Sequence, residues 1–297
     1  MNNHIKSSAS RRVFQVFNYI FLLCIYPFWY VVIYTLSDPS KAGEVPTVLI
    51  PSGFSLENYK QILTLNGFLP SLGISFARTV AGTVLSVGSC SFLGYLFSKE
   101  NMPFRKFLYR FLILTMYISG GMIATYIVIK SYGLLNTFWV YIIPGMISAY
   151  NVVLIKTYVE SLPASLEESA KLDGAGVLTI FTKIIFPLSK PIIATVAVFV
   201  AVGQWNSWFD NHIYTRGVEE LKTLQYLLYN YLNEAQRIAE QLRNATSSAD
   251  ASVLMQEISS KGIRMSITVL AALPIFLFYP FMQKYFVKGI MVGAVKG

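Results

Sequence analysis

Long apolar runs, almost free of charged residues and divided by short polar segments, dominate the pattern along this chain. Their approximate bounds are Phe14–Leu36, Leu72–Phe97, Phe111–Ile129, Phe138–Ile155, Ile192–Phe209 and Met265–Phe281. An apolar run of about 18 residues or more is long enough to cross a bilayer as a helix. The pattern therefore predicts an all-α integral membrane protein with six transmembrane helices.

The first apolar run follows a basic segment with Lys6, Arg11 and Arg12, as a secretory signal peptide also does. It is longer than the apolar core of a usual signal peptide, and no pair of small residues at cleavage spacing ends it. We therefore expect an uncleaved first span. Pro27 inside it is a candidate kink.

The composition agrees with a membrane protein. Residues of the hydrophobic types make up 54% of the chain and charged residues only 13%, whereas soluble domains carry about 25% charged residues. Both cysteines, Cys24 and Cys90, fall inside apolar runs, and His4 and His212 lie far apart with no ligand spacing around them. The sequence predicts no metal site.

The net charge of +9 is explained by topology. With the N-terminus in the cytoplasm, the cytoplasmic segments hold most of the 24 Lys and Arg and few of the 15 Asp and Glu, as the positive-inside rule requires. We therefore predict a cytoplasmic segment 1–13, a six-span transmembrane domain 14–286 and a cytoplasmic tail 287–297. No basic patch lies on a soluble domain, so a nucleic-acid partner is not expected.

Arg78 is the one strong charge inside a predicted span. It lies near the end of that span, so we expect its side chain to reach the interface by snorkelling, and an ion pathway is the less favoured alternative. The spans carry no acidic residue, which argues against a proton- or sodium-coupled carrier.

The segment between the fourth and fifth runs, residues 161–190, carries the strongest local signal. Ser165 and Glu168 have the spacing of a capping box, and Gly174 can supply a left-handed helix end. We predict a short helix, Leu166–Asp173, exposed to the cytoplasm, followed by an apolar helix that runs to Pro187.

The segment between the fifth and sixth runs, residues 210–264, is long and extracytoplasmic in this topology. Apolar residues from Leu221 to Leu242 recur at helical spacing and predict an amphipathic helix. It could cap the bundle of spans, or it could dock a partner that delivers substrate.

Residues 168–187 resemble a known family. Inner permease subunits of binding-protein-dependent ATP-binding-cassette importers carry a loop of pattern E-A-A, three residues, G, nine residues, I-x-L-P. Here Glu168-Ser169-Ala170 precedes Gly174, and Ile184-Ile185-Phe186-Pro187 follows at the same spacing. Ser169 and Phe186 depart mildly from the pattern. The triplet Asp173-Gly174-Ala175 and the wider chain look like the carbohydrate branch, with permeases of maltose, oligosaccharide or polysaccharide type.

The resemblance implies a type I importer permease in a bacterial plasma membrane that forms half of a translocation pathway. It implies a second homologous permease, two copies of an ATPase subunit, an extracytoplasmic solute-binding protein and a carbohydrate substrate. The helix would be the coupling helix that seats in the ATPase. The coupling residues would be Leu166, Glu167, Glu168, Ser169, Ala170, Leu172, Asp173 and Gly174.

The chain itself contains no phosphate-binding loop of the pattern G-x-x-x-x-G-K-[ST]. We therefore expect no cofactor on this chain and no enzymatic activity, with ATP and Mg bound by the partner ATPase.

Candidate pathway residues lie at the end of the fifth span and in the fourth. They are Gln204, Trp205, Asn206 and Trp208, with Tyr150 and Asn151 as a weaker pair. Indole rings stack on sugar faces and amides pair with hydroxyls, although tryptophans at this depth also form interfacial aromatic belts. Open alternatives are an importer of another solute, a self-sufficient carrier and a membrane enzyme.

Overall fold

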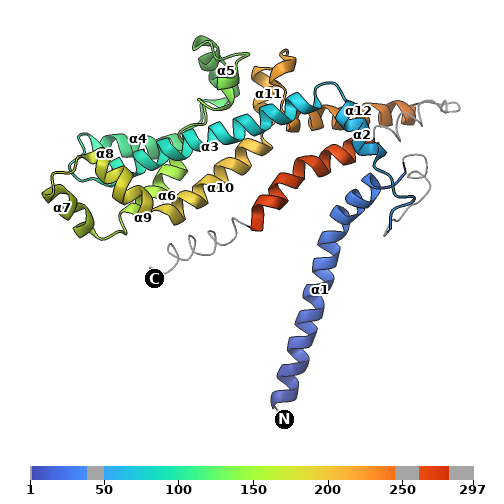
Figure 1. Cartoon of the computed structure of the whole chain (residues 1–297), viewed down its shortest axis with the longest axis horizontal. Coiled ribbons are helices and arrows are strands. Elements are labelled where there is room, and N and C mark those ends of the chain that lie inside the picture. The colour runs from blue at the N-terminus through green and yellow to red at the C-terminus, as the bar shows by residue number, and fades with distance from the viewer. Residues whose placement is uncertain (1, 39–49, 245–260, 281–297) are drawn as a thin grey trace. The chain divides into compact units, whose positions relative to one another are not determined.

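A computed structural model describes residues 2–38, 50–244 and 261–280 of the chain (Figure 1). Over these residues the regular secondary structure is helical, apart from one isolated β-bridge between Ser37 and Phe54. The α-helices are α1 (Asn2–Thr35), α2 (Glu57–Thr64), α3 (Phe68–Ser98), α4 (Arg105–Tyr117), α5 (Gly121–Ser131), α6 (Ala149–Val159), α7 (Ala164–Leu172), α8 (Val177–Ile180), α9 (Phe186–Leu188), α10 (Lys190–Asn206), α11 (Phe209–Tyr214) and α12 (Leu224–Asn244).

The described residues also contain three short helical segments of other types. Two are 3-10 turns, η1 (Phe138–Tyr141) and η3 (Glu219–Leu221), and one is a π-helical segment, η2 (Phe181–Ile185). A last helix, Lys261–Pro280, has no label in Figure 1. The predicted amphipathic helix is confirmed as α12, and the predicted tail 287–297 lies outside the described residues.

Three of the described helices are long and apolar enough to cross a membrane: Phe14–Thr35, Phe68–Ser98 and Lys261–Pro280. They coincide with the first, second and sixth predicted runs. A fourth candidate is a bent pair, Val177–Leu188 followed by Lys190–Asn206, with an angle of 83° at the break. Pro187 and Pro191 flank that break, and proline lacks the N–H that a continuous helix needs.

The third and fourth predicted runs are not single helices. In the third run the helix stops at Tyr117 and resumes at Gly121, whose φ of 75° lies in the left-handed region. In the fourth run η1 comes first, and α6 begins only at Ala149, after Pro144 and Gly145. Hydropathy alone does not report these interruptions, because the turn residues are themselves uncharged.

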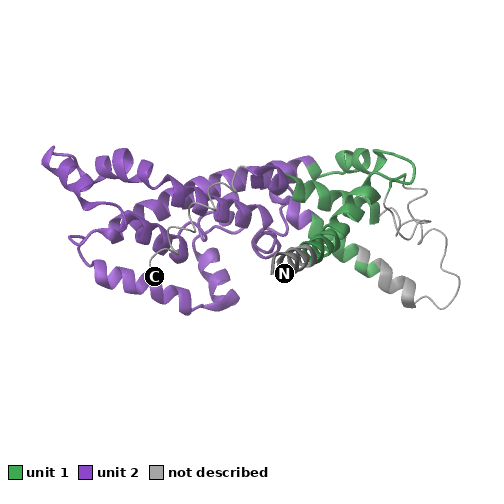
Figure 2. Cartoon of the chain, turned by 90° about the horizontal axis from the view of Figure 1, so that it is seen from below, with its two compact units in different colours: residues 1–68, 228–273 green, residues 69–227, 274–297 purple. Residues whose placement is uncertain are grey.

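The described chain divides into two compact units, coloured separately in Figure 2. Residues 1–68 and 228–273 make up unit 1. Within it, Tyr59 Oη lies 2.8 Å from Thr35 Oγ1, and Asn58 Nδ2 donates to the Thr35 and Ser37 carbonyls at 3.1 and 3.2 Å. These bonds hold α2 against the end of α1.

Residues 69–227 and 274–297 make up unit 2, which holds every candidate site. Its core is an apolar cluster from α3, α6, η2 and α10 that includes Cys90, Val152, Ile155, Ile185 and Val196. A Cβ at Gly94 of α3 would lie 2.9 Å from Ile155 Cγ2 of α6. The small residue therefore lets these two helices approach closely, as membrane helices often do.

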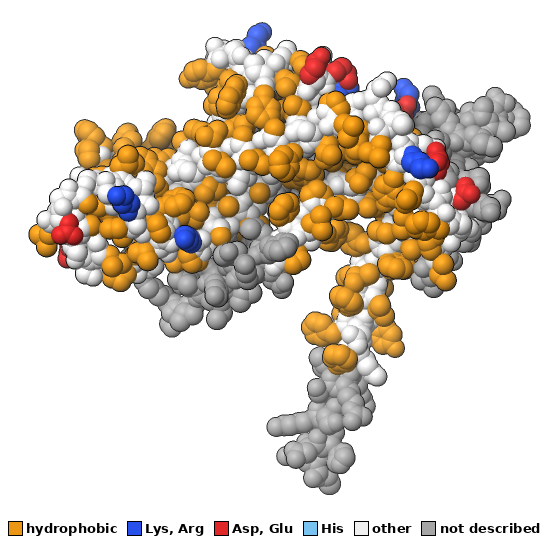
Figure 3. All heavy atoms as spheres, viewed as in Figure 1, with side chains coloured by type: hydrophobic (Ala, Val, Ile, Leu, Met, Phe, Trp, Pro, Cys, Tyr) orange, Lys and Arg blue, Asp and Glu red, His pale blue; other side chains and the backbone are white. Residues whose placement is uncertain are grey.

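The outer surface is largely apolar. Figure 3 shows hydrophobic side chains spread widely over the visible face and few charged ones. Exposed apolar residues are frequent on α1, α4 and α5, for example Leu23, Phe107 and Ile123. Such a surface suits contact with lipid rather than with water.

Candidate functional site

The short helix predicted at Leu166–Asp173 is present as α7, and it begins earlier than expected. The helix runs from Ala164 to Leu172, with Pro163 at its N-cap and no side-chain capping bond. The predicted capping box of Ser165 and Glu168 is therefore wrong, because Ser165 already lies within the first turn. Pro163 has φ −60°, close to the angle that its ring imposes, and the helix starts directly after it.

The helix ends as predicted at Gly174, which adopts φ 78°. The Gly174 N–H donates to the Lys171 carbonyl at 3.0 Å, and the Ala175 N–H donates to the Ala170 carbonyl at 2.9 Å. This pair of bonds is the Schellman motif, in which glycine is favoured because it has no Cβ to strain the left-handed conformation.

One side of α7 faces the protein and the other faces outward. Ala170 is buried in the core cluster, whereas Glu168, Ser169 and Asp173 are exposed. Leu172 is 90% exposed, and Leu166, Val177 and Leu178 are exposed as well. The helix therefore presents a mixed apolar and acidic surface that includes most of the predicted coupling residues.

Glu167 is the exception, because its side chain points back to the protein and is only 13% exposed. It forms an ion pair with Lys99, which directly follows α3, and a second one with Lys171 at 3.1 Å. Burial raises the pKa of the Glu167 carboxyl, but the hydrogen bonds and charges of Lys99 and Lys171 outweigh it and hold this pKa below its ordinary value.

The segment after α7 is braced against α3 by aromatic rings. The ring of Phe181 lies 5.3 Å from that of Phe92 and 5.4 Å from that of Tyr95, between centroids. The ring of Phe186 packs edge-on against that of Phe181, with 5.7 Å between centroids. In η2 the Phe186 N–H donates to the Phe181 carbonyl, five residues back. This π-helical register accommodates Pro187, which cannot donate within a helix.

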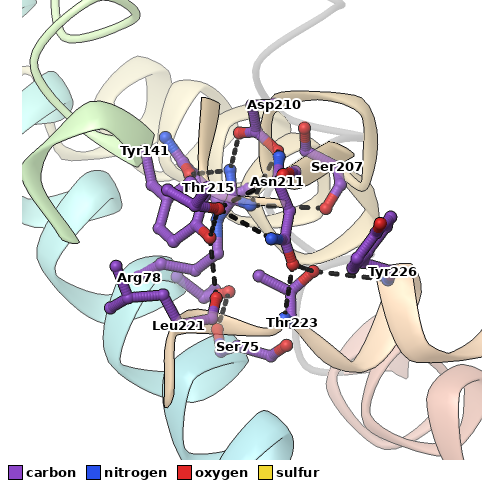
Figure 4. A network of polar contacts seen from close by, with 12 residues as sticks. Ser75, Arg78, Tyr141, Ser207, Asp210, Asn211, Thr215, Leu221, Thr223 and Tyr226 are labelled. Atoms are coloured by element: carbon purple, nitrogen blue, oxygen red, sulfur yellow. Dashed lines mark hydrogen bonds and ion pairs between the residues drawn. The ribbon is translucent and has the colours of Figure 1, made fainter. Parts of the chain in front are cut away.

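A second candidate site surrounds Arg78, in the first half of α3 (Figure 4). Arg78 is 1% exposed, so the expected snorkelling is wrong. Its guanidinium donates to Asp210 Oδ1 and Oδ2 at 3.1 and 2.5 Å, to Gln204 Oε1 at 3.1 and 3.2 Å, and to the Ser207 carbonyl at 3.3 Å. All five N–H donors of the side chain are thus used, which compensates for burying the charge.

The charges fit the helix ends between which they lie. Ser207 is the C-cap of α10, and Asp210 lies in the first turn of α11. A cation at a helix C-terminus and an anion at a helix N-terminus both interact favourably with the helix dipole. The ring of Tyr141 covers the guanidinium, with Cζ 4.5 Å from the ring centroid.

The same network continues to the start of α12 (Figure 4). The Tyr141 hydroxyl donates to the Leu221 carbonyl at 2.7 Å and lies 2.6 Å from Thr215 Oγ1. Asn211 Oδ1 accepts from the Thr223 N–H at 2.8 Å, and Ser75 Oγ of α3 accepts from the Leu224 N–H at 2.8 Å. The network joins α3, η1, α11 and the first turn of α12.

The predicted pathway residues fall into an exposed group and a supporting group. Gln204 bonds to Arg78, and Trp205 and Asn151 are buried. Asn206 is exposed and accepts from Gln225 Nε2 at 3.4 Å, and Tyr150 is exposed in the first turn of α6. The Trp208 ring lies 6.1 Å from the His212 ring. Gln204 and Asn206 are thus brought near the Arg78 network, whereas Tyr150 and Asn151 lie on another helix.

Sequence reasoning missed Asp210 and Lys99. A buried arginine in a span needs an anionic partner, and Asp210 is the first acid after the fifth run, which was a usable signal. Lys99 had no such signal, because many cytoplasmic lysines follow spans under the positive-inside rule. Within the described residues no group of three His, Cys, Asp or Glu could hold a metal ion.

Comparisons with known proteins identify relatives over the whole chain. A family model described as binding-protein-dependent transport system inner membrane component matches residues 90–209. Protein LplC of Bacillus subtilis is 36% identical over 98% of this chain and 97% of its own length. The polygalacturonan/rhamnogalacturonan transport system permease protein YtcP of Bacillus subtilis is 35% identical over 96% of this chain and 99% of its own.

Two further likenesses agree with these. The maltodextrin transport system permease protein MalD of Streptococcus pneumoniae is 30% identical, with both chains covered in full. Among solved structures, a chain of a bacterial ABC transporter involved in the import of the acidic polysaccharide alginate matches with a TM-score of 0.79 and 27% identity. That match covers 93% of this chain and 98% of the other.

Proposed function

Because this chain belongs to the binding-protein-dependent transport system inner membrane components, we propose that it is the permease subunit of an ATP-driven importer of oligosaccharides or polysaccharides. The observation that carries this proposal is the end-to-end similarity to YtcP, which is named as a polygalacturonan/rhamnogalacturonan transport system permease protein. The similar fold of the alginate importer chain agrees with it. The chain contributes the path through the membrane, and ATP and Mg are bound by a partner ATPase.

The proposed membrane topology keeps six spans with both termini in the cytoplasm. Phe14–Thr35, Phe68–Ser98 and Lys261–Pro280 each form a span, and α8 to α10 form a bent one. We assign the remaining two spans to broken segments, α4 with α5 and η1 with α6, because a break in a span is tolerated where neighbouring helices can bond the freed backbone groups. Reporter fusions after residues 98 and 159 should then both report the cytoplasm.

The exposed face of α7 is the surface that we propose binds the ATPase. Leu166 and Leu172 supply apolar contact, and Glu168, Ser169 and Asp173 supply polar contact. Ala170 and Gly174 act from within, since one packs in the core and the other ends the helix. ATP-driven closure of two ATPase subunits would then move α7 and open the pathway outward.

The remaining partners follow from the same family. A second, related permease completes the pathway, and an extracytoplasmic solute-binding protein delivers the carbohydrate to the side that holds α12. Exposed Asn206 and Tyr150, with Trp208, are the proposed sugar contacts. Gln204, Trp205 and Asn151 support them from the buried side.

The experiment that tests this function is a mild-detergent pull-down of the tagged chain from its native membranes, with the recovered proteins identified by mass spectrometry. We expect an ATPase and a second permease. Glu168→Lys should lower ATPase recovery, whereas Glu100→Lys, the same charge change at an exposed residue outside α7, should not. Recovery of the chain alone, still competent for uptake in vesicles, would mean a self-sufficient carrier instead.

A further inference from the structure

Two adjacent acids of α7 face in opposite directions. Glu168 is exposed on the outer face, whereas the carboxylate of Glu167 contacts Lys99 of the same chain. A docking partner could therefore meet Glu168, but Glu167 is already engaged. Its role must concern how α7 is held on its own subunit.

Lys99 is well placed to hold α7, because its own position is fixed. It directly follows α3, and its N–H donates to the Leu96 carbonyl at 3.0 Å. Its Nζ lies 4.3 Å from the centroid of the Tyr95 ring. An ammonium group over an aromatic face is held electrostatically, so the lysine has few alternative positions.

A second contact prevents α7 and its following segment from pivoting about that ion pair. Phe181 in η2 packs on both Tyr95 and Phe92 of α3. The ion pair and the ring cluster attach the segment to the same end of α3 at two places. Because α3 holds α7 and the following segment at two places, we expect them to move together with α3.

The other half of α3 carries the Arg78 network. Arg78 lies 20 residues before Ser98, which is about 30 Å along a helix. Arg78 donates hydrogen bonds to Gln204 and the Ser207 carbonyl at the end of α10 and to Asp210 at the start of α11. A movement of α3 is therefore transmitted to the segment that carries the proposed sugar contacts.

We propose that Lys99 is a positioning residue for transport, which ties the coupling helix to α3 so that the movement of α7 reaches the Arg78 network. This inference rests on the proposed function. The tie is specific to Glu167, whose other cation, Lys171, lies on α7 itself and cannot connect α7 to α3.

The test uses the complete transporter reconstituted in liposomes with its ATPase and loaded binding protein. It measures the number of substrate molecules transported per ATP hydrolysed. We expect Lys99→Met and Lys99→Glu to lower this ratio by about tenfold. The exchanged pair, Lys99→Glu with Glu167→Lys, should restore the ratio in part. Full restoration is not expected, because the exchange loses the cation–π contact with Tyr95 and places a second cation four residues before Lys171. Lys171→Met, the matched control, removes the other cation and should leave the ratio unchanged.

Three results would overturn the proposal. They are an unchanged ratio in Lys99→Met, a lower yield of complex with an unchanged ratio, and a failure of the exchanged pair to restore any part of the ratio. The second would show a purely structural role, because a loss of folded complex lowers transport and hydrolysis together. Failure of the wild-type chain to recruit an ATPase would instead count against the proposed function.

Discussion

Arg78 and Asp210 form a two-pronged ion pair, with Nη1 to Oδ1 at 3.1 Å and Nη2 to Oδ2 at 2.5 Å, although 132 residues separate them in the sequence. The arginine side chain is 2% exposed and the aspartate 20%. An arginine buried in this way depends on its partner, because a charge left alone in an apolar interior is strongly destabilising.

Replacing Asp210 with Asn should therefore lower the stability of the chain by about 3 kcal/mol. The amide keeps the shape of the side chain but leaves the Arg78 charge without its anion. The thermal unfolding temperature of the detergent-purified protein measures this effect. Glu219→Gln, which removes a carboxylate that is 76% exposed from a local pair with Lys222, should change that temperature little. Equal shifts in the two variants would contradict the ion pair's role.

A side chain at Gly82 is predicted to displace Gln204, because a Cβ there would lie 2.8 Å from Gln204 Cδ and Nε2, and Gln204 is held in place by its bonds to Arg78. Gly82→Ala should push Gln204 away from Arg78 and cost about 1–3 kcal/mol. Gly88 of the same helix has nothing within 4 Å of its Cβ position. Gly88→Ala should therefore stabilise α3 by about 0.5–1 kcal/mol. Thermal unfolding of both variants side by side checks the opposite signs.

The sequence predicted helices wherever a local pattern determined them. The end of α7 followed from Gly174, because a left-handed helix end is a property of a few adjacent residues. The amphipathic α12 followed from its spacing of apolar residues. The start of α7 was misplaced because two local signals competed, and Pro163 determined it rather than the spacing of Ser165 and Glu168.

Local sequence patterns did not predict the contacts between segments that are distant in the sequence. The partner of Arg78 depends on how α3 and α11 pack, and the partner of Glu167 depends on how α7 folds back on α3. For Arg78 the sequence offers only the general need of a buried arginine for an acid, which points to Asp210. For Glu167 it offers no signal, because many cytoplasmic lysines follow spans. The breaks at Tyr117 and Ala149 were hidden for a different reason, since glycine, serine and proline interrupt a helix without adding charge.

Gly174→Val should uncouple ATP hydrolysis from transport while the protein still reaches the membrane. A β-branched side chain in the left-handed region is strained, so the Schellman end of α7 would open and the helix would lose its fixed direction. Gly176, with φ −73° and open space at its Cβ position, is the matched control. Transport per ATP should fall about tenfold in Gly174→Val and stay close to the wild type in Gly176→Val.

The ion pairs of Glu167 predict a dependence of stability on pH. Its pKa is lowered from the ordinary value of 4.5. Burial raises this pKa, but the hydrogen bonds and charges of the two lysines lower it by more. The stabilisation is therefore fully present above pH 4.5 and is lost as the pH falls through the lower pKa of the folded state. Glu167→Gln lacks this stabilisation at every pH.

We therefore expect the difference in unfolding temperature between the wild type and Glu167→Gln to be constant from about pH 8 to about pH 5 and to shrink in more acidic buffer. Glu168→Gln removes an exposed carboxylate outside these pairs, and its unfolding temperature should stay close to that of the wild type throughout. A difference for Glu167→Gln that persists unchanged at about pH 3 would mean that the carboxylate stabilises α7 without its charge. The electrostatic tie between α7 and α3 would then be refuted, and the packing of Phe181 on Tyr95 would be the contact that holds them together.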